Sequence, residues 1–425
     1  MKNKEKVQVN QSWTENLHQA LDNLTTSALP LFENFKMTLE NNVLPLMTEV
    51  KQTRISSLSI EVQEENLLIL SHNSFNQSSM LILENVIENW EKQTCKKVLL
   101  DFSNKGLNSD SINEINQVFD KCQDISEFRI NFSRGTFTDK EILAISWSKI
   151  NTMKNLQVLE INLDLCSCVT DEGVAYLFNT IFASVKRLQS LEIRLSETNL
   201  SDSSLKILNP SMPQLWGGLV NFNMDLYGTK ITDLAIQEFS ATMKKVALNL
   251  RKFAFSLSQT QITDFSMAAF SSKVISSMPL LQEFELYLSN TRVSDSGIEQ
   301  LCTALRKFLP SIQAFTLNIG NLNVTEKTAQ LLSQNLFTEM KFLQKLELFC
   351  YNTNFRDDDL KSILKSMTES MKDLEILELN FDFTAVSDNS LEFLIQALKN
   401  LKSCNLSLNC TQVTQKMKNY LKNYF

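Results

Sequence analysis

A repeat of about 31 residues dominates this sequence and limits the folds open to it. Eleven rows align when each is numbered from an apolar residue at position 0, and positions 3, 5 and 7 of every row are apolar as well. The spacings between row starts are 30, 31 and 32 residues, then 31 six times, then 27. Such a period indicates stacked units that contact chiefly their neighbours. The rows start at Cys95, Ile125, Leu156, Leu188, Leu219, Leu250, Leu281, Ile312, Leu343, Leu374 and Leu401.

Each row has the pattern of a strand, a turn and a helix. The alternation at positions 3, 5 and 7 predicts a strand. Position 12 is apolar again, position 13 is usually Ser or Thr, position 14 is usually Asp, and apolar residues then recur every three or four residues. Ser/Thr-Asp before such a run predicts a helix start, because side-chain oxygens satisfy free N–H groups and the negative charge suits the helix dipole. The strands are far enough apart in the chain for parallel pairing. We therefore expect an α/β solenoid with a curved parallel sheet inside and helices outside.

These rows resemble the leucine-rich repeat of the ribonuclease-inhibitor-like type found in protist proteins. The row from Leu281 to Asp295 illustrates the pattern, with Phe284, Leu286 and Leu288 in its strand and Thr291 in its turn. That turn position usually holds Asn in the family, whereas Thr is commonest here. The resemblance covers about residues 95–425. It implies the fold but says little about activity, because this fold serves many unrelated roles.

The chain divides into three predicted parts. Residues 95–425 form about eleven repeats of ~31 residues, and residues 55–94 form a degenerate first repeat. Residues 1–54 form an N-terminal helical cap, because apolar residues recur at helical spacing from Leu17 to Val50, with Pro30 and Pro45 dividing the helices. A cap would cover the apolar end of the stack. An adaptor-binding module of the F-box kind and helix-mediated self-association are the alternatives.

Two rows depart from the pattern. The third carries one extra residue around Cys166-Ser-Cys168. The fourth has Pro210, Pro213 and Trp216 where a helix should continue, so that helix must stop early. This irregularity is either structural accommodation or a contact site.

The sequence contains little that points to catalysis. Its two histidines, His18 and His72, lie outside the clear repeats, so the repeats cannot supply a Ser-His-Asp or Cys-His site. The eight cysteines form no CxxC pair, and no phosphate-binding glycine motif occurs. We expect no enzyme activity, no cofactor and no metal site.

Charge and hydropathy indicate the compartment and the partner classes. The formal net charge of −7 argues against nucleic acid as a partner. No stretch approaches 18 apolar residues, and the N-terminal MKNKEKVQVNQSW lacks the apolar core of a secretory signal. We therefore expect no membrane partner and an intracellular, most simply cytoplasmic, protein with reduced cysteines.

The side chains at positions 4, 6 and 8 of each row should point away from the core and form the concave face of the solenoid. Carboxylates outnumber cations there, with Arg129 and Arg194 as the basic residues. The acidic residues are Asp101, Glu160, Asp164, Glu192, Asp225, Glu285, Glu347, Glu378 and Asp382. Aromatic residues on exposed strand positions are typical interface anchors. The predicted protein-binding residues are Asp225, Tyr227, Glu285, Tyr287, Glu347, Phe349, Tyr351 and Glu378.

These features favour a non-catalytic protein-binding scaffold. Its partner would be a protein with a basic or mixed surface, and the chain could also be a subunit of a larger assembly. Two alternatives stay open: a GTPase-activating regulator resembling the Ran GTPase activator family, and a ubiquitin-ligase substrate receptor. The basic C-terminal stretch, with Lys416, Lys418 and Lys422, weighs against the first, because that family often carries an acidic tail.

Overall fold

The computed structural model describes residues 51–55, 58–63, 67–72, 96–121, 124–185, 187–206, 217–309, 311–391, 394 and 401–422. For residues 51–72 only the backbone is described. The predicted helices between residues 17 and 50 and the segment with Pro210, Pro213 and Trp216 lie outside these ranges.

The strands form one fourteen-stranded sheet in sequence order. The first three strands pair antiparallel, and every later neighbour is parallel, beginning with β3 and β4. β4 to β14 occupy positions 2–6 of the eleven rows, which confirms the repeat register. The strands are β1 (Lys51–Ile55), β2 (Leu58–Gln63), β3 (Leu67–His72), β4 (Lys97–Asp101), β5 (Glu127–Asn131), β6 (Val158–Asn162), β7 (Ser190–Arg194), β8 (Asn221–Asp225), β9 (Lys252–Ser256), β10 (Glu283–Tyr287), β11 (Ala314–Asn318), β12 (Lys345–Phe349), β13 (Ile376–Asn380) and β14 (Ser403–Ser407).

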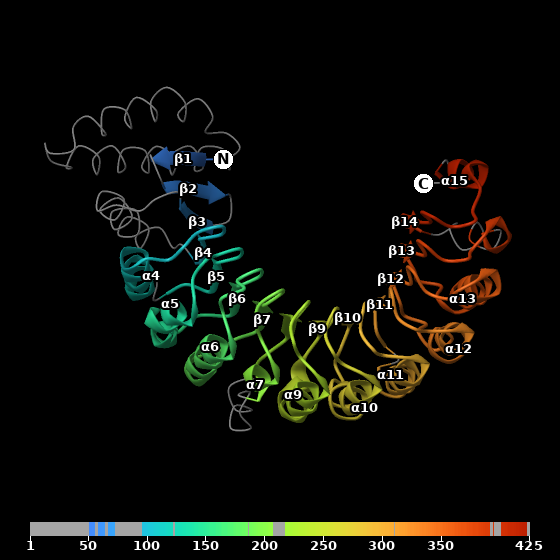
Figure 1. Ribbon diagram of the computed structural model, residues 1–425, viewed down its shortest axis with the longest axis horizontal. Coiled ribbons are helices and arrows are strands. Elements are labelled where there is room, and N and C mark those ends of the chain that lie inside the picture. Colours follow the sequence, from blue (N-terminus) through green and yellow to red (C-terminus); the bar gives the residue numbers. More distant parts are fainter. Residues whose placement is uncertain are drawn as a thin grey trace, which may run out of the picture.

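Helices follow the strands and cover the outer side of the sheet. Figure 1 shows an arc with the strands along its inner side and the helices along its outer side. The protein is therefore an α/β leucine-rich-repeat solenoid. The α-helices are α4 (Ser109–Lys121), α5 (Asp139–Ala144), α6 (Asp171–Ser184), α7 (Asp202–Leu205), α9 (Asp233–Val246), α10 (Asp264–Lys273), α11 (Asp295–Phe308), α12 (Glu326–Gln330), α13 (Asp357–Ser370) and α15 (Gln415–Lys422). Short 3-10 segments are η4 (Trp147–Thr152), η5 (Ala247–Asn249), η6 (Ile275–Ser277) and η8 (Asp388–Ser390), and η7 (Leu331–Leu336) is a π-helix.

The core lies between the sheet and the helices, where the apolar columns of successive rows stack. At position 3 of four consecutive rows the column is phenylalanine: Phe222, Phe253, Phe284 and Phe315, all fully buried. Neighbouring rings stack with centroids 5.6, 6.1 and 6.1 Å apart. Burial of four large rings in register fixes the strands of the central repeats against one another.

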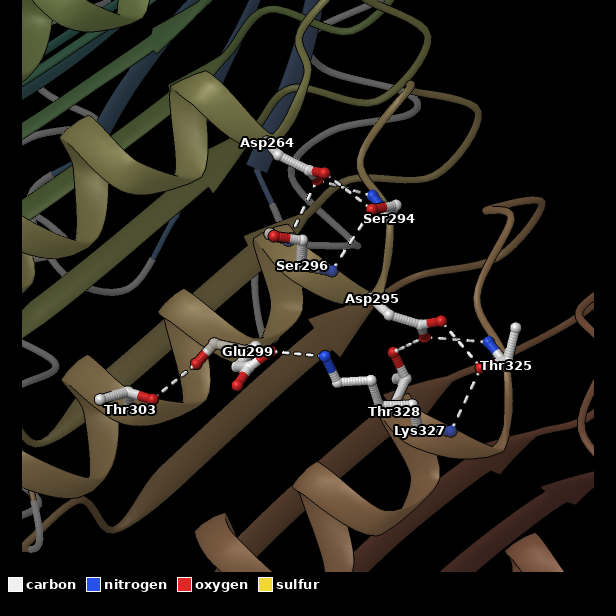
Figure 2. A network of polar contacts seen from close by, with 10 residues as sticks. Asp264, Ser294, Asp295, Ser296, Glu299, Thr303, Thr325, Lys327 and Thr328 are labelled. Atoms are coloured by element: carbon white, nitrogen blue, oxygen red, sulfur yellow. Dashed lines mark hydrogen bonds and ion pairs between the residues drawn. The ribbon is translucent and has the colours of Figure 1, made fainter.

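The Asp that recurs at position 14 of the rows links one repeat to the next. The Ser/Thr at position 13 caps its own helix as predicted: the Ser294 hydroxyl accepts from the N–H of Ser296. Asp264 belongs to the preceding repeat, yet its carboxylate accepts from the backbone N–H of Ser294, from the Ser294 hydroxyl and from the N–H of Gly297 (Figure 2). Each such helix start is thus capped from two repeats. The same carboxylate contact recurs on Thr170, Ser201, Thr232, Thr263, Thr325, Ser387 and Thr414.

Two junctions between described repeats lack this link. At the first, position 14 of the row from Cys95 is Ser109, and the Thr138 N–H donates to Glu141 of its own repeat at 2.7 Å. The second follows the row from Ile312. Position 14 of the row from Ile312 is Glu326, and position 13 of the next row is Arg356. The Arg356 N–H is satisfied within its own repeat by Asp359, at 2.9 Å. In the same repeat as Glu326, α12 is short and continues as the π-helix η7.

A left-handed residue follows each strand at position 9, with φ between 50 and 69° in all eleven rows. Only Gly228 is a glycine, so the other rows hold a side chain in a conformation that costs energy. The turn is closed by the residue after it: where this is Thr, its hydroxyl donates to the carbonyl at position 7, as Thr260 does to Leu257 at 2.6 Å.

Candidate protein-binding surface

The concave face is formed by side chains that alternate with the buried ones along each strand. The eight predicted residues all lie on this face, on β8, β10, β12 and β13 or directly after them, and all are partly exposed. Glu347 and Glu378 are direct neighbours across β12 and β13. The aromatic residues lie on alternate strands, because Asn318 of β11 separates Tyr287 from Phe349.

Two lysines that were not among the predicted residues neutralise part of the acidic charge. Lys252, the first residue of β9, pairs with Glu285 at 2.8 Å and with Glu283 at 3.2 Å. Lys345, the first residue of β12, pairs with Glu347 at 2.7 Å. Position 2 has the same parity as positions 4, 6 and 8, and that alternation is the signal that locates these lysines from sequence.

Two of the acidic residues toward the N-terminal side, Glu160 and Asp164, are paired as well. Arg129 lies 3.5 Å from the Glu160 carboxylate, and Arg194 lies 2.8 Å from that of Asp164. Burial raises the pKa of Glu192, and the neighbouring charge of Glu160 raises it further. On this half of the face the two arginines thus neutralise part of the acidic charge.

The C-terminal side carries carboxylates that contact only neutral groups in the part of the chain that the structure describes. Glu378 accepts from the Asn405 amide at 3.1 Å. Asp382 accepts from the Ser407 hydroxyl at 2.8 Å and from the Asn409 amide at 3.2 Å. Neither carboxylate forms an ion pair with a cation among the described residues.

Tyr287 lies at the centre of the acidic and aromatic residues. Its hydroxyl donates to Glu285 at 3.2 Å. Burial raises the pKa of Tyr287, and the charge of Glu285 raises it further, so the side chain remains a neutral hydrogen-bond donor. The Glu347 and Asp225 carboxylates act in the same direction, which places negative charge on both sides of the ring.

Tyr351 packs onto the adjacent strand rather than standing away from it. A Cβ added to Gly320 would lie 2.3 Å from two atoms of the Tyr351 ring, so the ring rests against the Gly320 backbone. Small residues on the face are buried beneath their larger neighbours: Ala254, Ser258, Ser289 and Thr316 are at most 4% exposed. The face therefore presents partly exposed aromatic and polar side chains beside buried small ones, and we call the four aromatic residues Tyr227, Tyr287, Phe349 and Tyr351 the platform.

Three of the described thiols, Cys166, Cys302 and Cys404, are poorly suited to nucleophilic chemistry. Burial raises the pKa of Cys166 to about 11 and that of Cys302 and Cys404 to about 12. Thiols with such values remain protonated at neutral pH. Among the described residues, no group of three or more His, Cys, Asp or Glu side chains is arranged to hold a metal ion. No helix within the described ranges is long and apolar enough to cross a membrane.

The chain has structural neighbours among solved proteins. No protein-family model matches the chain, and no curated protein matches it. Among solved structures, the chain is similar to an internalin from Listeria monocytogenes, with 13% sequence identity and a TM-score of 0.41 over 90% of this chain and 89% of that one. The assignment of the fold rests on the chain's own register of strands and helices.

Proposed function

We propose that the protein is a non-catalytic scaffold that binds a protein partner on its concave face between β8 and β13. The observation that carries this proposal is the platform of Tyr227, Tyr287, Phe349 and Tyr351, partly exposed among carboxylates. Rigid aromatic side chains supply large contact area at little cost in conformational entropy, and they dominate many interfaces. Nothing in the fold requires them there, because the strand positions are held by the buried columns.

The partner is a protein with a basic or mixed surface. Glu378 and Asp382 supply uncompensated charge at one end, whereas the ion pairs of Lys252 and Lys345 lower the charge at the centre. A partner with cations near β13 and apolar groups near β10 and β12 would satisfy both regions. Nucleic acid is disfavoured on this face because carboxylates outnumber cations.

We propose that this scaffold is intracellular, most simply cytoplasmic. A role as a subunit of a larger assembly is compatible with this proposal. Cys166, Cys168, Cys302, Cys350, Cys404 and Cys410 are free thiols, which suits a reducing compartment. The ribonuclease-inhibitor-like repeat subtype belongs to the same proposal and is supported by the 31-residue spacing and by full α-helices such as α11. No contact in the described residues favours GTPase activation or ubiquitin-ligase reception.

The test is capture of partners from cells that express the protein naturally, followed by affinity measurement with the purified partner. The variant combines Glu285→Gln, Tyr287→Ala, Glu347→Gln and Tyr351→Ala. We expect it to lose the partner, with single tyrosine truncations weakening binding by about tenfold or more.

The matched control carries Glu238→Gln and Glu299→Gln, which make the same charge change on the outer helices α9 and α11. It should retain the partner. Both variants must keep the cooperative melting transition of the wild type. Capture of the same partners by the wild type and by the concave-face variant would exclude the concave face as the binding site.

A further inference from the structure

A second surface lies on one flat face of the arc, where helices end and strands begin. Strands and helices run antiparallel, and Figure 1 views the helices nearly end-on, so all helix C-termini lie on the same flat side. Four exposed apolar side chains occur there in four consecutive repeats: Leu248 (56% exposed), Leu280 (51%), Phe308 (37%) and Phe342 (57%). We call this side, defined by these residues and the cations beside them, the strand-start face.

The fold does not require these apolar residues. Leu280 and Phe342 directly precede Leu281 and Leu343, which are the buried position-0 residues of their rows. In other rows the residue before position 0 is hydrophilic: Asn155, Arg187, Asn249, Ser311 and Asp373. Leu280 and Phe342 are therefore additional to the core, and it is their combination with cations that distinguishes this side.

Cations accompany these apolar side chains. Lys244, Arg251, Lys307 and Lys341 are exposed, and within the described residues none of them forms an ion pair with a carboxylate. The Lys307 ammonium lies 4.9 Å from the centroid of the Phe308 ring. The helix dipole accounts for lysines in a last helical turn. It does not account for Arg251 and Lys341, which follow the helices, in a chain whose net charge is −7.

A surface with exposed apolar side chains beside cations that form no ion pair within the described residues suits one kind of partner in particular. Leu and Phe side chains can enter the boundary between head groups and acyl chains, while Lys and Arg attract anionic lipids. Nucleic acid would use the cations but leave Leu248 and Leu280 exposed to water. All four apolar residues lie between the end of a helix and the start of the next strand, on one flat side of the arc, which matches the plane of a bilayer. Peripheral contact of this kind needs no membrane span.

We propose that the strand-start face binds the surface of a bilayer that contains anionic lipid. The arc then lies flat on the membrane, and its concave face stays open to a protein partner. This goes beyond the proposed function and is independent of it, because no concave-face residue takes part.

The experiment is sedimentation of the full chain with vesicles of phosphatidylcholine alone or with about one-third phosphatidylserine. We expect binding to the anionic vesicles and none to phosphatidylcholine alone, with affinity falling as salt rises. The variant Leu280→Ser/Phe342→Ser should weaken binding by at least about tenfold. The variant Arg251→Gln/Lys341→Gln should weaken it by about tenfold or more, since each cation near the surface contributes about 1 kcal/mol.

The chain offers a matched control on the opposite flat face. Leu234 and Phe265, in the first turns of α9 and α10, are 59% and 73% exposed. Leu234→Ser/Phe265→Ser should bind vesicles as the wild type does, and so should the concave-face variant. No binding to anionic vesicles would overturn the proposal. So would unchanged binding of the Leu280→Ser/Phe342→Ser variant, an equal loss in the Leu234→Ser/Phe265→Ser control, or binding to a soluble polyanion as tight as to the vesicles.

Discussion

Asp264 of one repeat holds Ser294 of the next through both of its carboxylate oxygens. Oδ1 accepts from the Ser294 backbone N–H at 2.8 Å, and Oδ2 accepts from the Ser294 hydroxyl at 2.7 Å. The hydroxyl in turn accepts from the Ser296 N–H. One aspartate therefore positions the start of the next helix, and repetition of this contact along the arc couples the helical side of repeats that are also joined by sheet hydrogen bonds and apolar packing.

Removal of the Asp264 carboxylate should lower the free energy of unfolding. Asp264→Ala leaves the Ser294 and Gly297 N–H groups without their acceptor, so we expect a loss of about 1–3 kcal/mol in the free energy of unfolding. Urea denaturation measures it. Asp358→Ala is the control, because that carboxylate lies in the first turn of α13 but is 99% exposed, and it should change stability by less than about 0.5 kcal/mol. Equal effects of the two substitutions would contradict a role for the inter-repeat contact.

The same aspartates should make stability fall in acid. Burial acts to raise the pKa of Asp233 and Asp295, but hydrogen bonds from Ser266 and Thr263 to the first, and from Thr325 and Thr328 to the second, outweigh it and lower both values. A lowered folded-state pKa contributes stability that is present above the unfolded value of 3.8 and lost as the pH falls through the folded value.

Thermal melting between pH 5 and about pH 2.5 tests this linkage. The melting temperature of the wild type should fall further over this pH range than that of the Asp233→Asn/Asp295→Asn variant. The variant melts at a lower temperature at pH 5 but has two fewer carboxylates to protonate. Parallel curves for the two proteins would show that these carboxylates do not carry the acid sensitivity.

The sequence predicts the repeat register well because burial imposes it on every row. Positions 3, 5 and 7 must be apolar for the stack to have a core, so Phe253, Phe284 and Phe315 reveal the strands directly. The Ser/Thr at position 13 is equally informative, because few side chains can cap a helix. The second role of Asp264 is not visible in this way, since a contact between repeats depends on the stacking geometry.

Other features leave weaker traces in the sequence. The left-handed position 9 holds residues as different as Leu165, Gln259 and Phe383, so no residue type identifies it. Lys252 pairs with Glu285 on the neighbouring strand β10, whereas Lys345 pairs with Glu347 on its own strand β12, and the sequence does not show which carboxylate a long side chain will contact. The prediction of a strongly acidic concave face is thus incomplete at its centre, where these lysines pair with Glu285 and Glu347.

The contact between Gly320 and Tyr351 gives a test of the platform. Gly320→Ala should displace the Tyr351 ring and cost about 1–3 kcal/mol of stability, as overpacking does. In a Tyr351→Ala background the same substitution should cost much less, because the overlapping ring is gone. A double-mutant cycle by denaturant unfolding measures this coupling. Additive effects of the two substitutions would show that the ring does not rest on Gly320.

The turn after β9 gives a matched pair of glycine substitutions with opposite expected signs. Gln259 is left-handed, with φ of 57°, and exposed, whereas Gln261, two residues on, is exposed but not left-handed. A left-handed conformation costs a side chain roughly 1–2 kcal/mol, while glycine adds about 0.5–1 kcal/mol of unfolded-state entropy. Gln259→Gly should therefore raise the free energy of unfolding by about 0.5–1 kcal/mol, and Gln261→Gly should lower it by a similar amount. The denaturation midpoints of the two variants, measured together with that of the wild type, test this prediction. If both glycine substitutions destabilise the protein equally, contacts of the Gln259 side chain offset the backbone strain at position 9. The side chains would then stabilise the turn.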